Sequence, residues 1–254
     1  MIDIHSHILP GIDDGSKEIE MSIQILKEAR QAGVRDIILT PHYIQDYYEN
    51  TKEKVETLLP KLQAEIEKEQ IDINLYPGNE IYITPEMHQL VKEGIVTTLN
   101  NSKYVLFELP MQNHVVYVKD MIFNLLALGY IPVIAHPERY TYVQENPNML
   151  YELIEIGALF QSNIGSVLGA YGKKEKATAL LLLKHHMIHF LASDTHRPNT
   201  FYPKIEEVFR QLEKQISKTD IQKLLEQNPR KILENGKIEI EEPIPIKKGI
   251  FGYK

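Results

Sequence analysis

The sequence predicts an α/β protein in which parallel strands form a closed or nearly closed barrel. Short apolar segments alternate with longer amphipathic segments over most of the chain, and this alternation is typical of successive strand–helix units. Several of the apolar segments are almost continuously hydrophobic, as expected of parallel strands covered on both faces. The length of 254 residues suits one barrel. We therefore expect a single domain over residues 1–254.

Seven segments have the composition of buried strands. Each is short, rich in Ile, Val, Leu or Phe, and bounded by proline, glycine or polar residues. In chain order they are residues 1–5, 35–42, 73–80, 103–110, 131–138, 158–165 and 188–196. Because crossovers between parallel strands are right-handed, such a series favours a barrel over an open sheet.

Helical patterns lie between these strands, at residues 17–33, 51–70, 115–129, 146–157 and 174–187. In the first helix, one face is expected to carry Ile19, Ile23, Leu26 and Arg30, with Gly33 at the end. Pro60 is expected to bend or restart the second helix. The last segment, residues 228–254, is expected to form a short helix and then a tail.

Composition excludes several classes of protein. The net charge of −7 gives no electrostatic footprint for nucleic acid. The absence of cysteine excludes disulfides, thiolate metal sites and cysteine nucleophiles. No apolar run is long enough to insert into a membrane, and the N-terminus does not resemble a signal peptide, so we expect a cytoplasmic protein.

Potential metal ligands stand near the C-terminal ends of most predicted strands. They are His5, His7, His42, Glu80, Glu108, His136, Asp194 and His196. In a barrel these strand ends meet on one face, where active sites are built. Nitrogen and oxygen donors without sulfur suit manganese, iron or zinc, and so many donors require two or three divalent ions. The sequence therefore predicts a multinuclear metal site.

Other polar residues have simpler interpretations. Asp13 and Asp14 precede the first helix and could cap it. Five further histidines are expected outside the metal site, in helices, loops or packed positions: His88, His114, His185, His186 and His189. Several tyrosines could form an aromatic rim around the site: Tyr43, Tyr47, Tyr48, Tyr82 and Tyr140.

The motifs "HSH", "TPHY", "GNE", "FELP", "AHPER" and "SDTHRP" together resemble the PHP (polymerase and histidinol phosphatase) superfamily. The stretches "MIDIHSHILPGIDDGSK" and "PVIAHPERY" are similar to the bacterial manganese-dependent protein-tyrosine phosphatases of the CpsB/CapC/YwqE type. This resemblance implies a distorted (βα)7 barrel related to the TIM barrel. It also implies three ions, most naturally Mn²⁺, with Fe or Zn as alternatives, held by His5, His7, Asp14, His42, Glu80, Glu108, His136, Asp194 and His196. Asp14 is chosen over Asp13 as the ligand.

The same resemblance implies roles for two arginines. Arg139 in "HPER" matches the family's phosphate-binding arginine. Arg197 matches a second arginine that the family has after the D-x-H motif, although the intervening segment is shorter here than in the family. The implied reaction is hydrolysis of phosphotyrosine, a phosphoric monoester, by a metal-activated hydroxide, with the arginines binding phosphate and Asp14 or a coordinated water assisting the leaving group.

The implied substrate is a tyrosine-phosphorylated protein, the tail of a bacterial tyrosine kinase in capsule or exopolysaccharide regulation. Three alternatives remain open at this point. One is another PHP phosphoesterase, acting on histidinol phosphate or on DNA ends. The second is an amidohydrolase barrel, which also begins with H-x-H, and the third is a non-catalytic regulatory module that binds metal. The sequence does not indicate an oligomeric state.

Overall fold

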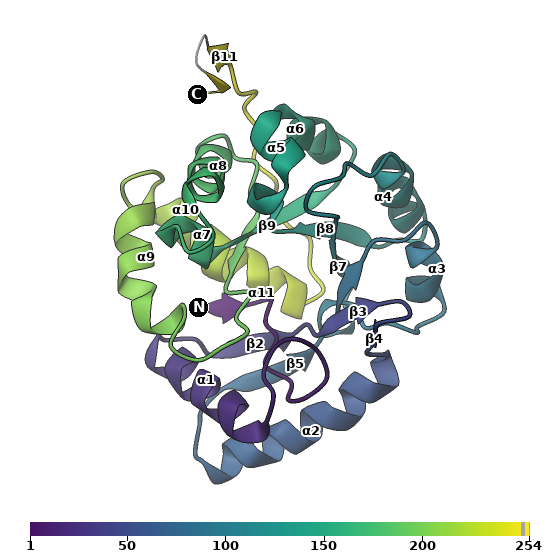
Figure 1. The fold of residues 1–254 in the computed structure, drawn as a ribbon, viewed down its shortest axis with the longest axis vertical. Helices are drawn as coiled ribbons and strands as arrows, with labels where there is room; N and C mark the ends of the chain where they lie inside the picture. Colours follow the sequence, from purple (N-terminus) through teal and green to yellow (C-terminus); the bar gives the residue numbers. More distant parts are fainter. Residues whose placement is uncertain (250–251, 254) are drawn as a thin grey trace.

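The computed structural model describes residues 1–249 and 252–253, and strands form its core with helices around them (Figure 1). One sheet contains three parallel strands, β1 (Ile2–Asp3), β2 (Asp36–Leu39) and β5 (Asn74–Pro77). The other sheet has the order β10 (Phe190–Ala192), β9 (Leu159–Asn163), β8 (Ile131–Ala135), β7 (Tyr104–Glu108), β6 (Glu80–Tyr82), β3 (His42–Ile44) and β4 (Tyr48–Glu49). Its strands pair in parallel except in the β3–β4 hairpin.

Two of the predicted strands are each divided into two segments. Residues 35–42 form β2 and the start of β3, and residues 73–80 form β5 and the start of β6. Pro41 interrupts the first because it has no N–H to donate to a ladder. Asn79 fills the second break, where its side-chain amide donates to the carbonyls of Pro41 and Asn50. The C-terminal halves of both strands can therefore turn toward a common centre.

The first and last barrel strands also meet. Ser6 and Thr195 form an isolated parallel bridge, and the N–H of His7 donates to the carbonyl of Thr195 over 3.0 Å. The strands thus follow one another in chain order around the core, although they form two ladders rather than one. The predicted α/β architecture of parallel strands is confirmed.

The helices lie outside the strands (Figure 1). Their bounds are α1 (Ile19–Gln31), α2 (Lys52–Lys68), α3 (Met87–Lys92), α4 (Val118–Ala127), α5 (Thr141–Glu145), α6 (Asn148–Glu155), α7 (Ile164–Leu168), α8 (Lys173–Lys184), α9 (Ile205–Leu212), α10 (Lys218–Gln222) and α11 (Asn228–Leu233). A one-turn 3-10 helix, η2 (Pro137–Arg139), follows β8, and a π-helical turn, η4 (Lys223–Gln227), joins α10 to α11. Among the described residues, no helix combines the length and the apolar character needed to cross a membrane.

The interior of the barrel is apolar at its N-terminal end. Ile4, Ile38, Leu106, Val133 and Phe190 from different strands pack there in one buried cluster. The segment after α11 closes this end, because the Tyr104 hydroxyl at the start of β7 donates to the carbonyl of Gly236. Ile232 of α11 and Ile238 join the same cluster. The candidate metal ligands therefore lie toward the opposite end.

Two details of the predicted helices differ in the structure. In α1 the buried residues are Ser22, Ile25, Leu26 and Ala29, while Ile19 and Ile23 are partly buried against the same core, so the centre of the inward face is shifted from the predicted one. Ser22 can lie inward because its hydroxyl donates to the carbonyl of Ile8. In addition, α2 does not restart at Pro60 but runs through it as one helix. The short helix predicted after residue 228 is confirmed as α11, and the tail beyond it includes residues 250, 251 and 254, which lie outside the described residues.

Candidate metal centre

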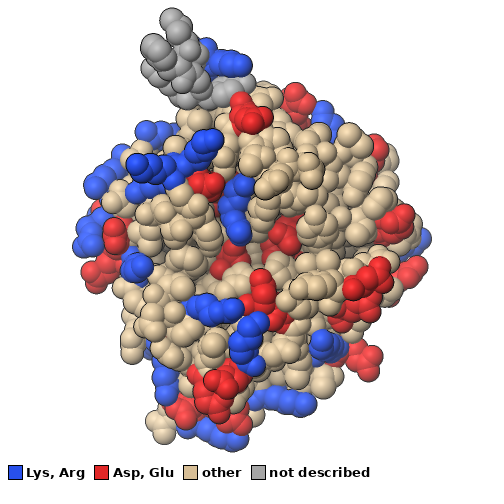
Figure 2. Space-filling model, in the orientation of Figure 1, with Lys and Arg blue, Asp and Glu red and all other residues tan. Residues whose placement is uncertain are grey.

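The residues predicted as metal ligands lie at the C-terminal ends of the barrel strands. They are His5 and His7 after β1, Asp14 in the loop before α1, His42 at the start of β3, Glu80 at the start of β6, Glu108 at the end of β7, His136 after β8, and Asp194 and His196 after β10. Figure 2 shows acidic side chains inside a hollow near the middle of this face, with basic side chains at its margin.

Donor atoms of these side chains gather into three groups, in each of which every atom lies within 4.8 Å of the others. The groups are His7, Asp14, His42 and His196; His5, His7 and Glu80; and His42, Glu80 and Glu108. The remaining two predicted ligands adjoin them, since His136 Nε2 is 3.0 Å from Glu80 Oε1 and Asp194 Oδ1 is 3.4 Å from His7 Nε2. All the predicted ligands therefore belong to one cluster.

Three buried atoms of this cluster have no hydrogen-bond partner, namely His136 Nδ1, His42 Nδ1 and Glu80 Oε2. The last two face each other at 3.1 Å. His5 Nε2 and His7 Nε2 are also only 3.2 Å apart. Unpaired buried donors and acceptors are costly, so these close contacts fit a site made for cations. The nitrogen and oxygen donors match the preferences of Mn²⁺, Fe or Zn²⁺.

The two neighbouring aspartates have different surroundings. Asp13 is buried, and its Oδ2 accepts from His7 Nδ1 over 2.8 Å and from the His42 N–H over 3.1 Å. Its carboxylate thereby turns His7 Nε2 toward the cluster. Asp14 is half exposed, and its Oδ1 lies 3.3 Å from His196 Nε2. The geometry favours Asp14 as the ligand and Asp13 as the residue that orients His7.

Burial and charge change the pKa values of the cluster in the metal-free chain. Burial lowers the pKa of His5, but the carboxylates of Glu80 and Asp194 outweigh it and raise the pKa to about 9. Burial, together with the same two carboxylates, raises the pKa of Glu108 to about 9. Burial lowers the pKa of His42 to about 4. In the metal-free chain, bound protons therefore supply part of the positive charge that bound cations would supply.

Two of the predicted ligands have strained backbone. His136 has φ of 33° and Asp194 has φ of 50°, in the left-handed region that non-glycine residues seldom adopt. Tyr140 supports the turn after His136, because its hydroxyl donates to the carbonyl of Ala135 and accepts from the N–H of Leu109. Such strain is concentrated at functional sites, where the surrounding structure holds it in place.

The two predicted arginines differ in position. Arg139 is part-buried, donates to Asp194 Oδ2 over 3.2 Å, and lies with its Cζ 4.8 Å from the centre of the Tyr171 ring. The guanidinium of Arg197 instead donates to the carbonyls of Asp14 and Gly15. Arg197 thus ties the loop that carries Asp14 to the last strand. A phosphate contact by Arg197 stays a prediction.

The predicted aromatic rim is wrong for two of its members. Tyr43 and Tyr140 are buried in the main hydrophobic cluster. Tyr48 does lie beside the site, where its ring stacks on His42 with centroids 6.2 Å apart, and Tyr47 next to it is 72% exposed. Tyr82 is partly buried on β6.

Sequence reasoning missed two residues of β9. Gln161 Oε1 accepts from His5 Nδ1 over 2.7 Å, and Asn163 Nδ2 donates to Asp194 Oδ2 over 2.6 Å. Both side chains are fully buried. The available signal was a pair of amides in an otherwise apolar strand, "LFQSN", which is a weaker signal than a charge because amides also occur at ordinary strand ends.

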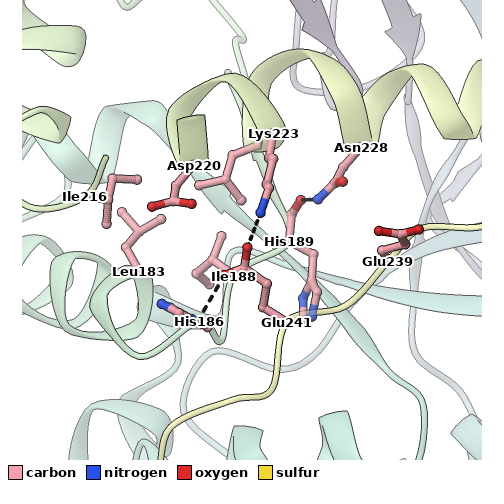
Figure 3. Close-up of a pocket in the computed structure, with 11 residues that line it drawn as sticks. Leu183, His186, Ile188, His189, Ile216, Asp220, Lys223, Asn228, Glu239 and Glu241 are labelled. Atoms are coloured by element: carbon pink, nitrogen blue, oxygen red, sulfur yellow. Dashed lines mark hydrogen bonds and ion pairs between the residues drawn. The ribbon is translucent and has the colours of Figure 1, made fainter. Parts of the chain in front are cut away.

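The remaining histidines lie outside the donor groups described above, as expected. Figure 3 shows a separate small pocket, of about 50 Å³, lined by His186 and His189 near the C-terminal segment. Within it, Glu241 contacts both His186 and Lys223. Ligand pockets are usually several times larger, so the strand-end cluster is the better candidate for the functional site.

Comparisons with known proteins show the family of the chain. A family model described as capsular polysaccharide synthesis, CpsB/CapC, matches residues 1–234. The tyrosine-protein phosphatase YwqE of Bacillus subtilis is 38% identical over 254 residues, which is 100% of both chains. The tyrosine-protein phosphatase CpsB of Streptococcus pneumoniae is 34% identical over 238 residues, covering 92% of this chain and 98% of that protein.

Solved structures give the same result. A crystal structure from work on YwqE of Bacillus subtilis and CpsB of Streptococcus pneumoniae, described as unique metal-dependent tyrosine phosphatases, matches with a TM-score of 0.91 at 38% identity. It covers 97% of this chain and 100% of that chain. A histidinol phosphate phosphatase from Lactococcus lactis has a TM-score of 0.54 at 15% identity over 84% of this chain and 93% of its own, a likeness in fold alone.

Proposed function

The chain belongs to the CpsB/CapC family of capsular polysaccharide synthesis, and we infer that it is a metal-dependent tyrosine-protein phosphatase. The observation that carries this inference is the cluster at the strand ends. There, His42 Nδ1 and Glu80 Oε2 face each other at 3.1 Å without a hydrogen bond. A cation between them would satisfy both atoms.

We propose that three divalent ions, most naturally Mn²⁺, occupy the cluster. The three donor groups support the number, and His7, His42 and Glu80 each belong to two groups, so that neighbouring ions would share ligands. The ligands in this proposal are His5, His7, Asp14, His42, Glu80, Glu108, His136, Asp194 and His196. Iron or zinc would also suit these donors.

Bound divalent ions supply Lewis-acid stabilisation of phosphoryl oxygens and make water a stronger acid at neutral pH. The side chains of the chain would do the rest. Arg139 is held by Asp194 and by the face of Tyr171. It would offer a planar fork of N–H donors to the phosphate oxygens and to the charge that develops during transfer.

Asp14 suits a ligand better than a general acid. A hydrogen bond to His196 lowers the pKa of Asp14, so the carboxyl group is ionised at neutral pH and has no proton to give. A tyrosine leaving group makes a smaller demand on such an acid, because phenols have a pKa of about 10. This matches an aryl phosphate better than an alkyl phosphate.

A groove lined by residues close in sequence to Arg139 supports the proposal of a protein substrate. It lies between α5 and α8, has a volume of about 440 Å³, and is lined by residues that include Thr141, Gln144 and Lys174. Thr141 follows Arg139 by two residues, and Lys174 follows Tyr171, which packs on Arg139, by three. A polypeptide that continues past a phosphotyrosine at Arg139 could lie in this groove. We propose a tyrosine-phosphorylated protein as substrate, namely the tail of a bacterial tyrosine kinase; the cytoplasmic location stays a prediction.

The test measures hydrolysis of three substrates by metal-stripped protein, before and after addition of MnCl₂. We expect hydrolysis of a phosphotyrosyl peptide and of a small aryl phosphate with manganese, and none after chelation. Histidinol phosphate, the substrate of the alternative phosphoesterase, should react much more slowly. Preference for histidinol phosphate would favour that alternative, and failure of the metal-loaded protein to hydrolyse any phosphoester would favour a non-catalytic metal-binding module.

A further inference from the structure

Two amide side chains of β9 connect two of the proposed ligands through a buried line of hydrogen bonds. His5 Nδ1 lies 2.7 Å from Gln161 Oε1, Gln161 Nε2 lies 2.9 Å from Asn163 Oδ1, and Asn163 Nδ2 lies 2.6 Å from Asp194 Oδ2. None of these four side chains is more than 3% exposed. Gln161 and Asn163, named the amide pair below, therefore form a continuous link across the site.

The geometry of β9 explains why the link is possible. Gln161 and Asn163 are two residues apart in a strand, so their side chains point to the same face. The neighbouring strand β10 leads directly into Asp194, and β1 leads into His5. β9 itself supplies no proposed ligand, and its inward positions are taken by the amide pair.

The line has only one consistent direction. An amide has an acceptor oxygen at one side and donor hydrogens at the other. Because the Asp194 carboxylate only accepts, Asn163 must turn its nitrogen toward it and its oxygen toward Gln161. Gln161 then turns its own oxygen toward His5, so His5 Nδ1 must carry a hydrogen. His5 Nε2 is left to face the cluster, where it lies 3.2 Å from Glu80 Oε2.

We propose that Gln161 and Asn163 are positioning residues for the metal centre, selecting the ring orientation of His5 and the carboxylate orientation of Asp194 that bind a cation. The proposal rests on the function inferred above and adds two residues to it. Asp194 Oδ2 also accepts from Arg139 over 3.2 Å. The amide pair therefore leaves Asp194 Oδ1 to the metal and Oδ2 to the proposed phosphate-binding arginine.

The first experiment measures Mn²⁺ affinity by titration calorimetry on metal-stripped protein, which needs no substrate. Gln161→Leu and Asn163→Leu should each weaken binding by about 10- to 100-fold, the usual effect of losing a partner of a metal ligand. The matched control is Asn148→Leu, which removes an amide that bonds to Ile246 far along the chain. Affinities of both variants equal to that of the control would overturn the proposal.

The double variant tests whether the two amides act as one line. If they do, either single substitution already breaks the line. The fold-loss of Mn²⁺ affinity in the double variant should then be much smaller than the product of the two single fold-losses. Losses that multiply would mean two independent supports and would contradict a continuous line.

A conservative variant separates positioning from packing. Gln161→Glu keeps an acceptor for His5 but cannot donate to Asn163, so its Mn²⁺ affinity should recover clearly above that of Gln161→Leu. Thermal unfolding of the metal-free forms is measured in parallel. Metal affinity that falls only in proportion to metal-free stability, with no recovery in Gln161→Glu, would show a merely structural role. If metal affinity behaves as proposed while phosphotyrosyl peptides are not cleaved, the inferred function fails and the amide pair stands.

Discussion

At the scale of single residues, Asp13 and Asp14 show how neighbours in sequence acquire different chemistry. Asp13 accepts hydrogen bonds from the His7 ring and from the backbone of His42 and Gly15. Such a carboxylate fixes which nitrogen of a histidine carries the proton. Asp14 has half its side chain exposed and approaches His196 and His42. One residue therefore orients a ligand while the next is available to act as one.

Asp13→Asn and Asp14→Asn test this difference. An asparagine at position 13 cannot accept from His7 and from both backbone donors at once, so we expect metal affinity to fall by about 10- to 100-fold with the full number of ions still reached at high Mn²⁺. Asp14→Asn removes a ligand charge and should lower the number of ions bound. Elemental analysis across a manganese titration measures both. The assignment is wrong if Asp13→Asn loses an ion and Asp14→Asn does not.

Arg139→Lys tests the proposed phosphate-binding role. Lysine keeps the charge but loses the planar fork and the stacking on Tyr171. We expect kcat for a phosphotyrosyl peptide to fall by about 10²-fold, with Mn²⁺ affinity changed little. Steady-state kinetics and calorimetry on the same preparation check this. Unchanged kcat would remove Arg139 from the mechanism.

Charged side chains at the site were predictable from sequence, whereas uncharged ones were not. Glu80 and Glu108 follow apolar strands, where an isolated charge is costly, and so stand out. Gln161 and Asn163 carry no charge, and their role depends on which neighbouring strands bring His5 and Asp194 within reach. Arg197 was predicted from its position in a motif, but its contacts to the carbonyls of Asp14 and Gly15 depend on how the loop folds back.

At the scale of elements, each of the seven predicted strands is present. Two of them are each divided into two shorter strands, which the sequence did not predict. Alternation of apolar and polar segments predicts where strands lie, but not that Asn79 would fill a break between β5 and β6. Its three buried hydrogen bonds reach Pro41, Asn50 and Thr97. These contacts are long-range and leave no trace in local periodicity. The same limit explains why the inward face of α1 is centred elsewhere than predicted, since buried Ser22 contacts the loop after β1.

Asn79→Ala tests the importance of this break. The change removes the side-chain partners of the Asn50 carbonyl and the Thr97 N–H and one of the two donors to the Pro41 carbonyl, and each buried group left unpaired costs about 1–3 kcal/mol. We expect the free energy of unfolding of the metal-free protein to fall by about 3–5 kcal/mol, measured by urea denaturation. Asn113→Ala, at an exposed position outside the left-handed region, is the control and should change stability by less than about 0.5 kcal/mol. Equal effects of the two substitutions would contradict a structural role for Asn79.

At the scale of the whole molecule, the barrel has one closed and one open end. Ile232 and Ile238 close the N-terminal end, and the strand ends at the other side carry the metal cluster. Sequence alone predicted the open end, because the candidate metal ligands follow the predicted strands at their C-terminal ends. It did not predict where the C-terminal segment packs, since isoleucines alternate along residues 238–246 as in a strand but the segment forms none. A single domain over residues 1–254 stays a prediction.

His189 predicts how the stability of the whole chain depends on pH. Burial lowers the pKa of its ring to about 3, and its Nδ1 accepts from the Phe160 N–H over 3.0 Å. Between pH 6.5 and 3 the unfolded chain therefore binds a proton that the folded chain does not. The contribution of His189 to the free energy of unfolding is complete above pH 6.5. It decreases as the pH falls, by up to about 1.4 kcal/mol per pH unit.

The variant His189→Gln keeps an acceptor for Phe160 and cannot titrate. Urea denaturation at several pH values from 4 to 7 should show a shallower loss of stability in the variant than in the wild-type protein, in the presence of a chelator. All other titrating groups are common to both proteins and cancel in the difference. Parallel curves would show that His189 does not contribute.

The most direct measurement of the central claim is a crystal structure of the manganese-loaded protein with anomalous diffraction recorded at the manganese edge. We predict three anomalous peaks at the strand ends, each surrounded by donor atoms from the groups that contain His7, Glu80 and His42. Peaks elsewhere on the chain, or none at this cluster in protein that hydrolyses phosphotyrosine, would contradict the account.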